Sequence, residues 1–74
     1  MLAEGKTQQA IQRFQNILSV DETQVETWIN LGLAHAVAGN CTEARQSWNT
    51  ALEHRPNDPT AKKYLDGLCQ YRAQ

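Results

Sequence analysis

Two stretches with helical spacing of apolar residues lie in the middle of the chain, on either side of Gly39-Asn40. Before this pair, Trp28, Leu31 and His35 occupy positions i, i+3 and i+7, which fall on one face of a helix. After it, the positions i, i+4, i+7 and i+8 are held by Ala44, Trp48, Ala51 and Leu52. Because the connection is so short, the two helices must lie antiparallel with these faces together. The pattern predicts a helical hairpin over residues 25–58.

The residues of this hairpin resemble the tetratricopeptide repeat, whose 34-residue pattern is W-x2-L-G-x2-Y, then A-x3-F, then P. The chain reads Trp28-x2-Leu31-Gly32-x2-His35, then Ala44-x3-Trp48, then Pro56. His35 stands where the family usually has Tyr, and Trp48 where it usually has Phe; both substitutes are planar. The resemblance implies an α-solenoid of paired helices in which Gly32 allows another helix to approach closely.

The same pattern recurs 34 residues earlier and fades 34 residues later. The earlier counterparts of Gly39, Ala44, Trp48, Ala51 and Leu52 are Gly5, Ala10, Phe14, Ile17 and Leu18. Towards the end, Trp28 corresponds to Lys62 and Gly32 to Asp66, as expected of a terminal repeat whose outer face meets water. We therefore expect a single all-α domain over residues 1–74 with about four helices. Residues 7–20 would form the second half of one repeat, 25–58 a full repeat, and 59–73 a capping helix.

Several polar residues and one glycine are placed where helices should begin or end. Thr7 is suited to be an N-cap, and Thr23 with Glu26 has the spacing of a capping box. Gly39 is free to adopt positive φ at the end of the central helix. Two further N-caps are expected at Asn40 and at Asp58, which precedes Pro59.

Composition and charge exclude several classes of protein. Seven basic and eight acidic residues give a net charge of −1, so no basic face is expected for nucleic acid or an anionic membrane. No apolar run approaches the roughly 18 residues of a membrane span. The first residues lack the apolar core of a secretory signal, which favours a cytoplasmic location.

No catalytic or metal-binding constellation stands out in the sequence. We find no Ser-His-Asp arrangement, no glycine-rich phosphate loop and no suggestively spaced pair of carboxylates, and we expect neither enzymatic activity nor a cofactor. His35 occupies the family's Tyr position and is interpreted as structural. Cys41 and Cys69 form no CxxC pair and are interpreted as buried free thiols. Together with His35 and His54 they have no recognised metal-ligand spacing, so no metal site is predicted.

With no catalytic or metal-binding residues predicted, the function is expected to lie in a binding surface. The resemblance implies that the first helix of each pair lines a concave peptide groove. Ile29, Leu33 and Val37, at i, i+4 and i+8, form an apolar strip that the core does not require; the alternative is ordinary exposed apolar surface. Asn30 matches an Asn with which chaperone-binding relatives hold a peptide carboxylate, but Thr60 and Tyr64 stand where a basic partner would be needed. A carboxylate clamp is therefore not supported. The groove candidates are Glu26, Ile29, Asn30, Leu33, Val37, Lys63, Tyr64 and Tyr71.

The sequence thus predicts a non-catalytic module that binds protein or peptide and acts as a scaffold or adaptor. One alternative is a structural cap or fragment of a longer repeat array attached to another domain. Another is a self-associating helical domain. That alternative rests on the first helix, whose flank around Ile11 is expected to lie uncovered, so that Ile11, Phe14 and Ile17 would support a weak homodimer.

Overall fold

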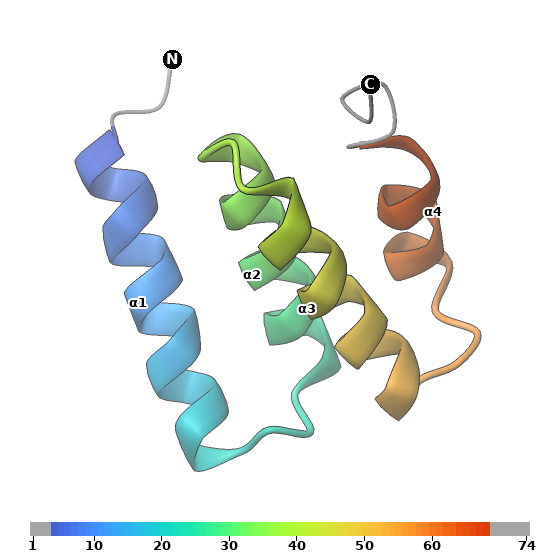
Figure 1. Ribbon diagram of the computed structural model, residues 1–74. Helices are drawn as coiled ribbons and strands as arrows, with labels where there is room; N and C mark the ends of the chain where they lie inside the picture. The colour runs from blue at the N-terminus through green and yellow to red at the C-terminus, as the bar shows by residue number, and fades with distance from the viewer. Residues whose placement is uncertain (1–3, 69–74) are drawn as a thin grey trace.

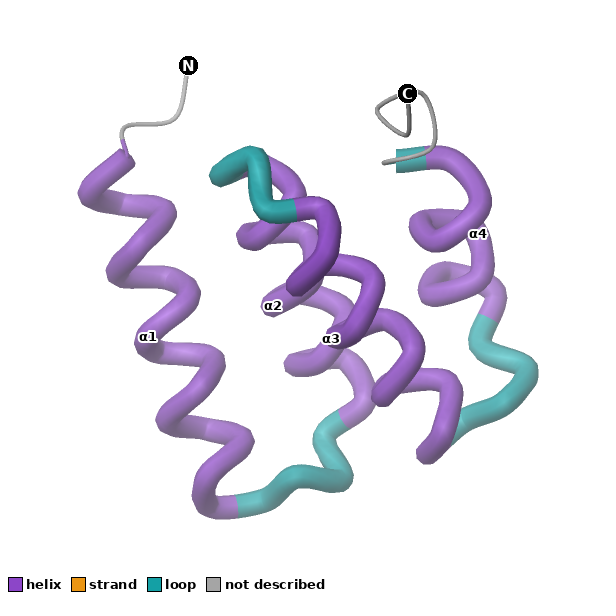
Figure 2. The backbone as a smooth tube through the Cα atoms, viewed as in Figure 1, coloured by secondary structure: helices purple, strands orange, loops and turns teal. Residues whose placement is uncertain are grey.

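The computed structural model describes residues 4–68, which form four α-helices. They are α1 (Glu4–Val20), α2 (Val25–Val37), α3 (Cys41–His54) and α4 (Pro59–Gly67). Consecutive helices run antiparallel, and the loops between them lie at alternating ends of the molecule (Figures 1 and 2). The predicted all-α fold of antiparallel hairpins is confirmed. The part of the predicted last helix beyond residue 68 lies outside the described residues.

The second helix holds the molecule together. α2 packs against α1, α3 and α4, whereas α1 packs against α2 alone among the described helices. Figure 1 shows α2 behind α3, with α1 and α4 on opposite sides of this central pair. One apolar cluster joins α2 to α3 and α4 and contains Val25, Ile29, Ala44, Trp48, Ala51 and Ala61. A second joins α2 to α1 and contains Ile11, Leu18 and Leu31.

Trp48 is the centre of the larger cluster. Its side chain is fully buried, and its indole Nε1 donates a hydrogen bond to the carbonyl oxygen of Ile29 at 3.1 Å. The indole lies directly over Gly32, where an added Cβ would be 2.3 Å from Nε1. The close approach expected at Gly32 is confirmed, and the group that approaches is the side chain of Trp48.

The α2–α3 turn satisfies backbone groups that the end of α2 leaves unpaired. Gly39 has a φ of 89°, and its N–H donates to the carbonyl of Ala36 at 3.0 Å. The N–H of Asn40 donates to the carbonyl of His35 at 2.8 Å. These two bonds define a Schellman motif, which requires a left-handed residue at the position of Gly39. Asn40 is the N-cap residue of α3, as predicted by position, but its side chain makes no capping hydrogen bond.

The strongest side-chain cap is at the start of α4. Asp58 Oδ1 accepts hydrogen bonds from the backbone N–H groups of Thr60 at 2.9 Å and Ala61 at 3.0 Å. Pro59 occupies the first helical turn, where its missing N–H costs nothing. The cap predicted for Asp58 is confirmed.

Two other predicted caps are wrong. Thr7 lies inside α1, which already begins at Glu4, and its side chain is buried. The capping box of Thr23 and Glu26 does not form, because the N-cap of α2 is Gln24 and no side chain caps it. Thr23 instead donates both its backbone N–H, at 3.0 Å, and its hydroxyl, at 2.6 Å, to Oδ1 of Asp21. This Asx-type turn competes with the cap for the hydroxyl of Thr23.

Candidate binding surface

The first candidate surface is a hollow between the first turns of α2 and α4. Its volume is about 450 Å³. The lining residues are Glu26, Ile29, Asn30, Arg55, Asp58, Pro59, Thr60 and Tyr64. Half of the predicted groove candidates are brought together here: Glu26, Ile29, Asn30 and Tyr64. The contact between α2 and α4 is therefore what shapes the hollow.

The floor of the hollow belongs to the core. Ile29 is only 6% exposed and packs in the cluster around Trp48. Tyr64 is half-buried, and its ring lies 5.5 Å from that of Trp48 between centroids, at an interplanar angle of 55°. This tilted geometry is favourable for an aromatic pair. The floor is thus fixed by packing before any ligand arrives.

The rim is polar, and its side chains differ in whether they already have hydrogen-bond or ionic partners. Asp58 is occupied, because Oδ1 caps α4 and Oδ2 accepts from Nη1 of Arg55 at 3.3 Å. The Arg55 side chain is 57% exposed, so the rest of its guanidinium faces solvent. Glu26, Asn30 and Thr60 are exposed, and none of their side chains has a hydrogen-bond or ionic partner among residues 4–68. These three side chains can be reached by a ligand.

The predicted apolar strip is not one continuous exposed surface. Ile29 is buried, Leu33 is half-buried and Val37 is 56% exposed. The expectation that the core does not require this strip is wrong for Ile29, because α2 meets three neighbouring helices and more of its circumference is covered. Leu33, Val37 and Lys63 do not line the hollow. Tyr71 lies outside the described residues.

Four lining residues were not on the list of groove candidates: Arg55, Asp58, Pro59 and Thr60. The Pro-Asn-Asp-Pro segment was interpreted only as the start of a helix. No pattern in the sequence signals that the α3–α4 loop brings Arg55 and Asp58 to the same hollow as residues of α2.

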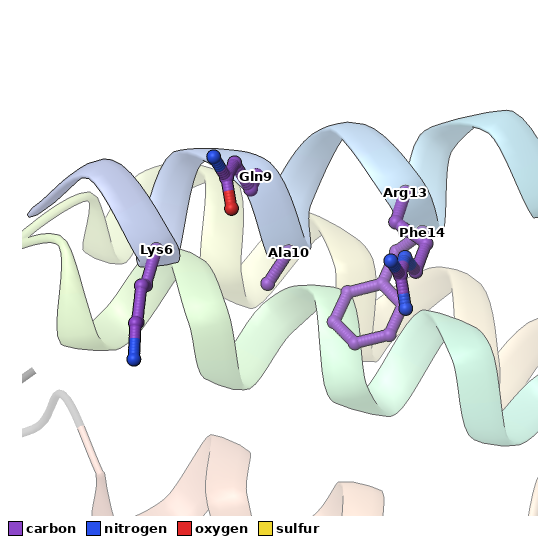
Figure 3. Close-up of a pocket in the computed structure, with 5 residues that line it drawn as sticks. All are labelled: Lys6, Gln9, Ala10, Arg13 and Phe14. Atoms are coloured by element: carbon purple, nitrogen blue, oxygen red, sulfur yellow. The ribbon is translucent and has the colours of Figure 1, made fainter.

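A second hollow lies on α1, and all of its lining residues belong to that helix. Its volume is about 370 Å³, and it is lined by Lys6, Gln9, Ala10, Arg13 and Phe14 (Figure 3). Ile17, one turn beyond Phe14, is 40% exposed. Ile11, in contrast, is only 6% exposed and packs with Leu18 and Leu31. The expectation of an uncovered flank around Ile11 is wrong, because Ile11 is on the side of α1 that faces α2.

The residues considered for chemistry are separated or already engaged. Cys41 is disulfide-bonded, so its interpretation as a free thiol is wrong; Cys69 lies outside the described residues. His35 is half-buried, and its Nδ1 is buried without a hydrogen-bond partner within residues 4–68. Over the same residues, no group of three or more His, Cys, Asp or Glu side chains is placed to hold a metal ion.

The α1–α2 loop contains the one carboxyl group with a clear electrostatic perturbation in the described part of the chain. Hydrogen bonds from the side chain and then the backbone of Thr23 lower the pKa of Asp21 below its ordinary value of 3.8. Gln24 Nε2 donates to the other oxygen at 3.3 Å. These bonds hold the α1–α2 loop in its turn conformation.

Antiparallel helices packed side by side, with Gly32 of α2 against the indole of Trp48 on α3, are typical of a helical-repeat protein. The Tetratricopeptide repeat family model matches residues 1–65, so the chain belongs to the tetratricopeptide repeat family. Proteins of this family typically bind other proteins and are generally non-catalytic. Comparison with curated proteins and with solved structures gave no match. No helix among residues 4–68 combines the length and the apolar character needed to cross a membrane.

Proposed function

We propose that the chain is a non-catalytic module that binds a peptide segment of another protein in the α2–α4 hollow and serves as a scaffold or adaptor. The observation that carries the proposal is the construction of this hollow. Its floor, Ile29 and Tyr64, is anchored on Trp48, while Glu26, Asn30 and Thr60 on its rim are unengaged. An apolar floor with a few convergent polar groups is typical of ligand sites, and the volume falls within their usual range of about 300–1,000 Å³.

The same proposal divides the chain into repeat units. We propose that residues 7–20 belong to the second half of one repeat and 25–58 to a full repeat, and that α4 (Pro59–Gly67) belongs to a capping helix. The packing of α2 against both α1 and α3 supports this division, since each hairpin of a helical repeat contacts its neighbours. In this arrangement α2 and α4 are the first helices of successive repeats, and the hollow lies between them.

The rim indicates what kind of peptide would fit. The amide of Asn30 and the hydroxyl of Thr60 can each donate to and accept from a peptide backbone. Glu26 adds a negative charge that has no ionic partner among residues 4–68, whereas the charge of Asp58 is balanced by Arg55. A neutral or basic segment with a small apolar side chain over Ile29 would match these groups. A peptide carboxylate would instead face Glu26, which agrees with the missing carboxylate clamp.

Reaction chemistry is not supported by these groups. The carboxylate of Asp58 holds two backbone N–H groups and a guanidinium, so it has no role as a general acid or base. Glu26 is exposed, and the two hydroxyl groups that line the hollow, on Thr60 and Tyr64, have no hydrogen-bonded base among residues 4–68. Binding is the function that the arrangement favours.

The test is a selection from a random peptide library on the immobilised chain, followed by calorimetric titration of the enriched peptide. Asn30→Ala and Glu26→Gln should each weaken binding by about tenfold, because each removes a group that contacts the ligand. Asn49→Ala, at an exposed position of α3 away from the hollow, is the matched control and should leave the affinity unchanged. Equal affinity in all variants would reject this site.

A further inference from the structure

The first residue of α3, Cys41, takes part in a disulfide bond. The chain has one other cysteine, Cys69, so this is the only residue of the same chain with which Cys41 can pair. Cys69 lies outside the described residues and follows directly on Leu68, the C-cap residue of α4. A bond between the two cysteines links the start of α3 to the end of α4.

The packing of α3 against α4 agrees with this pairing. The two helices run antiparallel, so the start of α3 and the end of α4 lie at the same end of the molecule (Figure 1). Trp48 and Tyr64 set the level of one helix against the other, since their ring centroids are 5.5 Å apart. From this contact, Cys41 is about 10.5 Å back along α3 and Leu68 about 6 Å forward along α4. Cys41 and Leu68 therefore lie within about one helical turn of the same level.

In the described part of the chain, packing holds the start of α4 more firmly than its end. Near the start, Asp58 caps two backbone N–H groups and Ala61 is fully buried. In the middle, Tyr64 and Leu65 are half-buried and pack on the cluster around Trp48. Residues 66–68 are all exposed. A disulfide one residue later supplies an attachment at the end where packing contributes least.

We propose that Cys41 and Cys69 form a reversible disulfide that clamps the end of α4 to α3 and so regulates binding in the α2–α4 hollow. The link to binding rests on the function proposed above, because Thr60 and Tyr64 of α4 line the hollow, whereas the clamp itself does not. The bond closes the chain from residue 41 to residue 69 into a loop that contains both helices, which restricts the unfolded chain and stabilises the pair. Without the bond, α4 separates from α2 and α3 more often, and the hollow loses one wall.

Opening the clamp takes two electrons and two protons, and a dithiol supplies both. One thiolate of the dithiol attacks a cysteine sulfur, the bond between the two cysteines breaks, and the other cysteine leaves as a thiolate that takes up a proton. The second thiol of the dithiol then displaces the first cysteine and closes a disulfide within the reductant. The reverse exchange with an oxidised dithiol closes the clamp. Cys41 is only half-buried, in keeping with a bond that a small dithiol can reach.

The first test follows the bond and α4 without any ligand. The chain is refolded with oxidised glutathione and alkylated in denaturant without reductant, and mass spectrometry should find both cysteines protected in one chain. Dithiothreitol should then make amide hydrogen exchange in α4 faster by about tenfold or more, with little change in α1. Cys41→Ser and Cys69→Ser, made separately, should exchange like the reduced chain and should not respond to dithiothreitol.

The second test adds the peptide enriched in the library selection. Its affinity should be about tenfold higher for the oxidised chain than for the reduced chain, and Cys41→Ser should bind like the reduced chain with or without dithiothreitol. Faster exchange in α4 with unchanged affinity would overturn the regulation of binding. A peptide that binds outside the hollow would reject the proposed function, while the exchange measurement still decides the clamp.

Three results of the first test would overturn the clamp. They are alkylation of both cysteines after refolding, a covalent dimer formed through them, and exchange in α4 that is unchanged by dithiothreitol. Equal acceleration in α1 and α4 would also overturn it, because reduction would then weaken the whole fold and not the attachment of α4.

Discussion

Gly32 of α2 and Trp48 of α3 are packed so closely that a methyl group on Gly32 would lie 2.3 Å from the indole nitrogen. The indole is held in place by its hydrogen bond to the carbonyl of Ile29, one turn earlier on α2. The ring of Tyr64, on α4, packs against the same indole. The spacing of α2, α3 and α4, and with it the shape of the α2–α4 hollow, therefore depends on this pair.

Gly32→Ala should destabilise the protein, although alanine is the better helix former. The added Cβ would force the buried Trp48 to move, and overpacking of this kind costs about 1–3 kcal/mol. Gly5→Ala is the matched control, since nothing lies within 4 Å of its added Cβ and φ is not in the left-handed region. That change should stabilise α1 by about 0.5–1 kcal/mol. Urea denaturation of both variants decides the matter, and a stabilised Gly32→Ala variant would contradict the packing.

Asp58→Ala should destabilise the protein by about 1–2 kcal/mol, because two backbone N–H groups at the start of α4 lose their acceptor. Asp58→Asn, which keeps an acceptor oxygen, should recover part of this loss. Asn40→Ala should change stability by less than about 0.5 kcal/mol, since Asn40 occupies an N-cap without making the capping bond. Thermal melts followed by circular dichroism provide the comparison. Equal losses of stability in Asp58→Ala and Asn40→Ala would contradict the finding that Asp58 makes capping hydrogen bonds and Asn40 does not.

His35→Phe should stabilise the protein. The Nδ1 of His35 is buried without a partner within the described residues, and an unsatisfied buried polar atom costs about 1–3 kcal/mol. Phe keeps a planar ring and removes the polar atom. His54→Phe, at an exposed position, is the control and should gain nothing. A lower melting temperature for His35→Phe than for the parent would contradict the conclusion that the buried Nδ1 destabilises the fold.

The ionised carboxylate of Asp21 should stabilise the folded protein at pH values above its ordinary pKa, and this stabilisation should be lost at lower pH. Its pKa is lowered in the folded state by hydrogen bonds from Thr23, so its contribution is present above about 3.8 and is lost as the pH falls further through the folded-state pKa. Melting temperatures between pH 2.5 and pH 6 should therefore fall less steeply towards acid in Asp21→Asn than in the parent. Glu22→Gln, in the same loop and exposed, is the control. Parallel curves for Asp21→Asn and the parent would exclude the contribution.

The sequence predicted the ends of helices correctly where a residue had only one structural role open to it. Gly39 ends α2 with positive φ, and Asp58 caps α4, as their types predicted. Thr23 was misassigned because two acceptors competed, and Asp21 holds its hydroxyl. Thr7 was misassigned because α1 extends back to Glu4.

Tertiary contacts determine which of the other candidate side chains are buried and which are exposed. Ile29 and Val37 have the same residue character and lie on a common helical strip, yet one is buried and the other exposed, because α3 covers only part of α2. Ile11 and Ile17 likewise cannot be ranked from spacing alone, since both lie near the apolar side of α1. Arg55 was missed because its position beside α2 depends on how the α3–α4 loop returns.

The most direct test of the proposed function is an NMR titration of the isotope-labelled chain with the peptide enriched in the library selection. Amide shifts should be largest at Glu26, Asn30, Thr60 and Tyr64, which line the α2–α4 hollow, and small on the outer face of α3. The result that would contradict the account is saturable binding with shifts centred on α1 or α3 and none in this hollow.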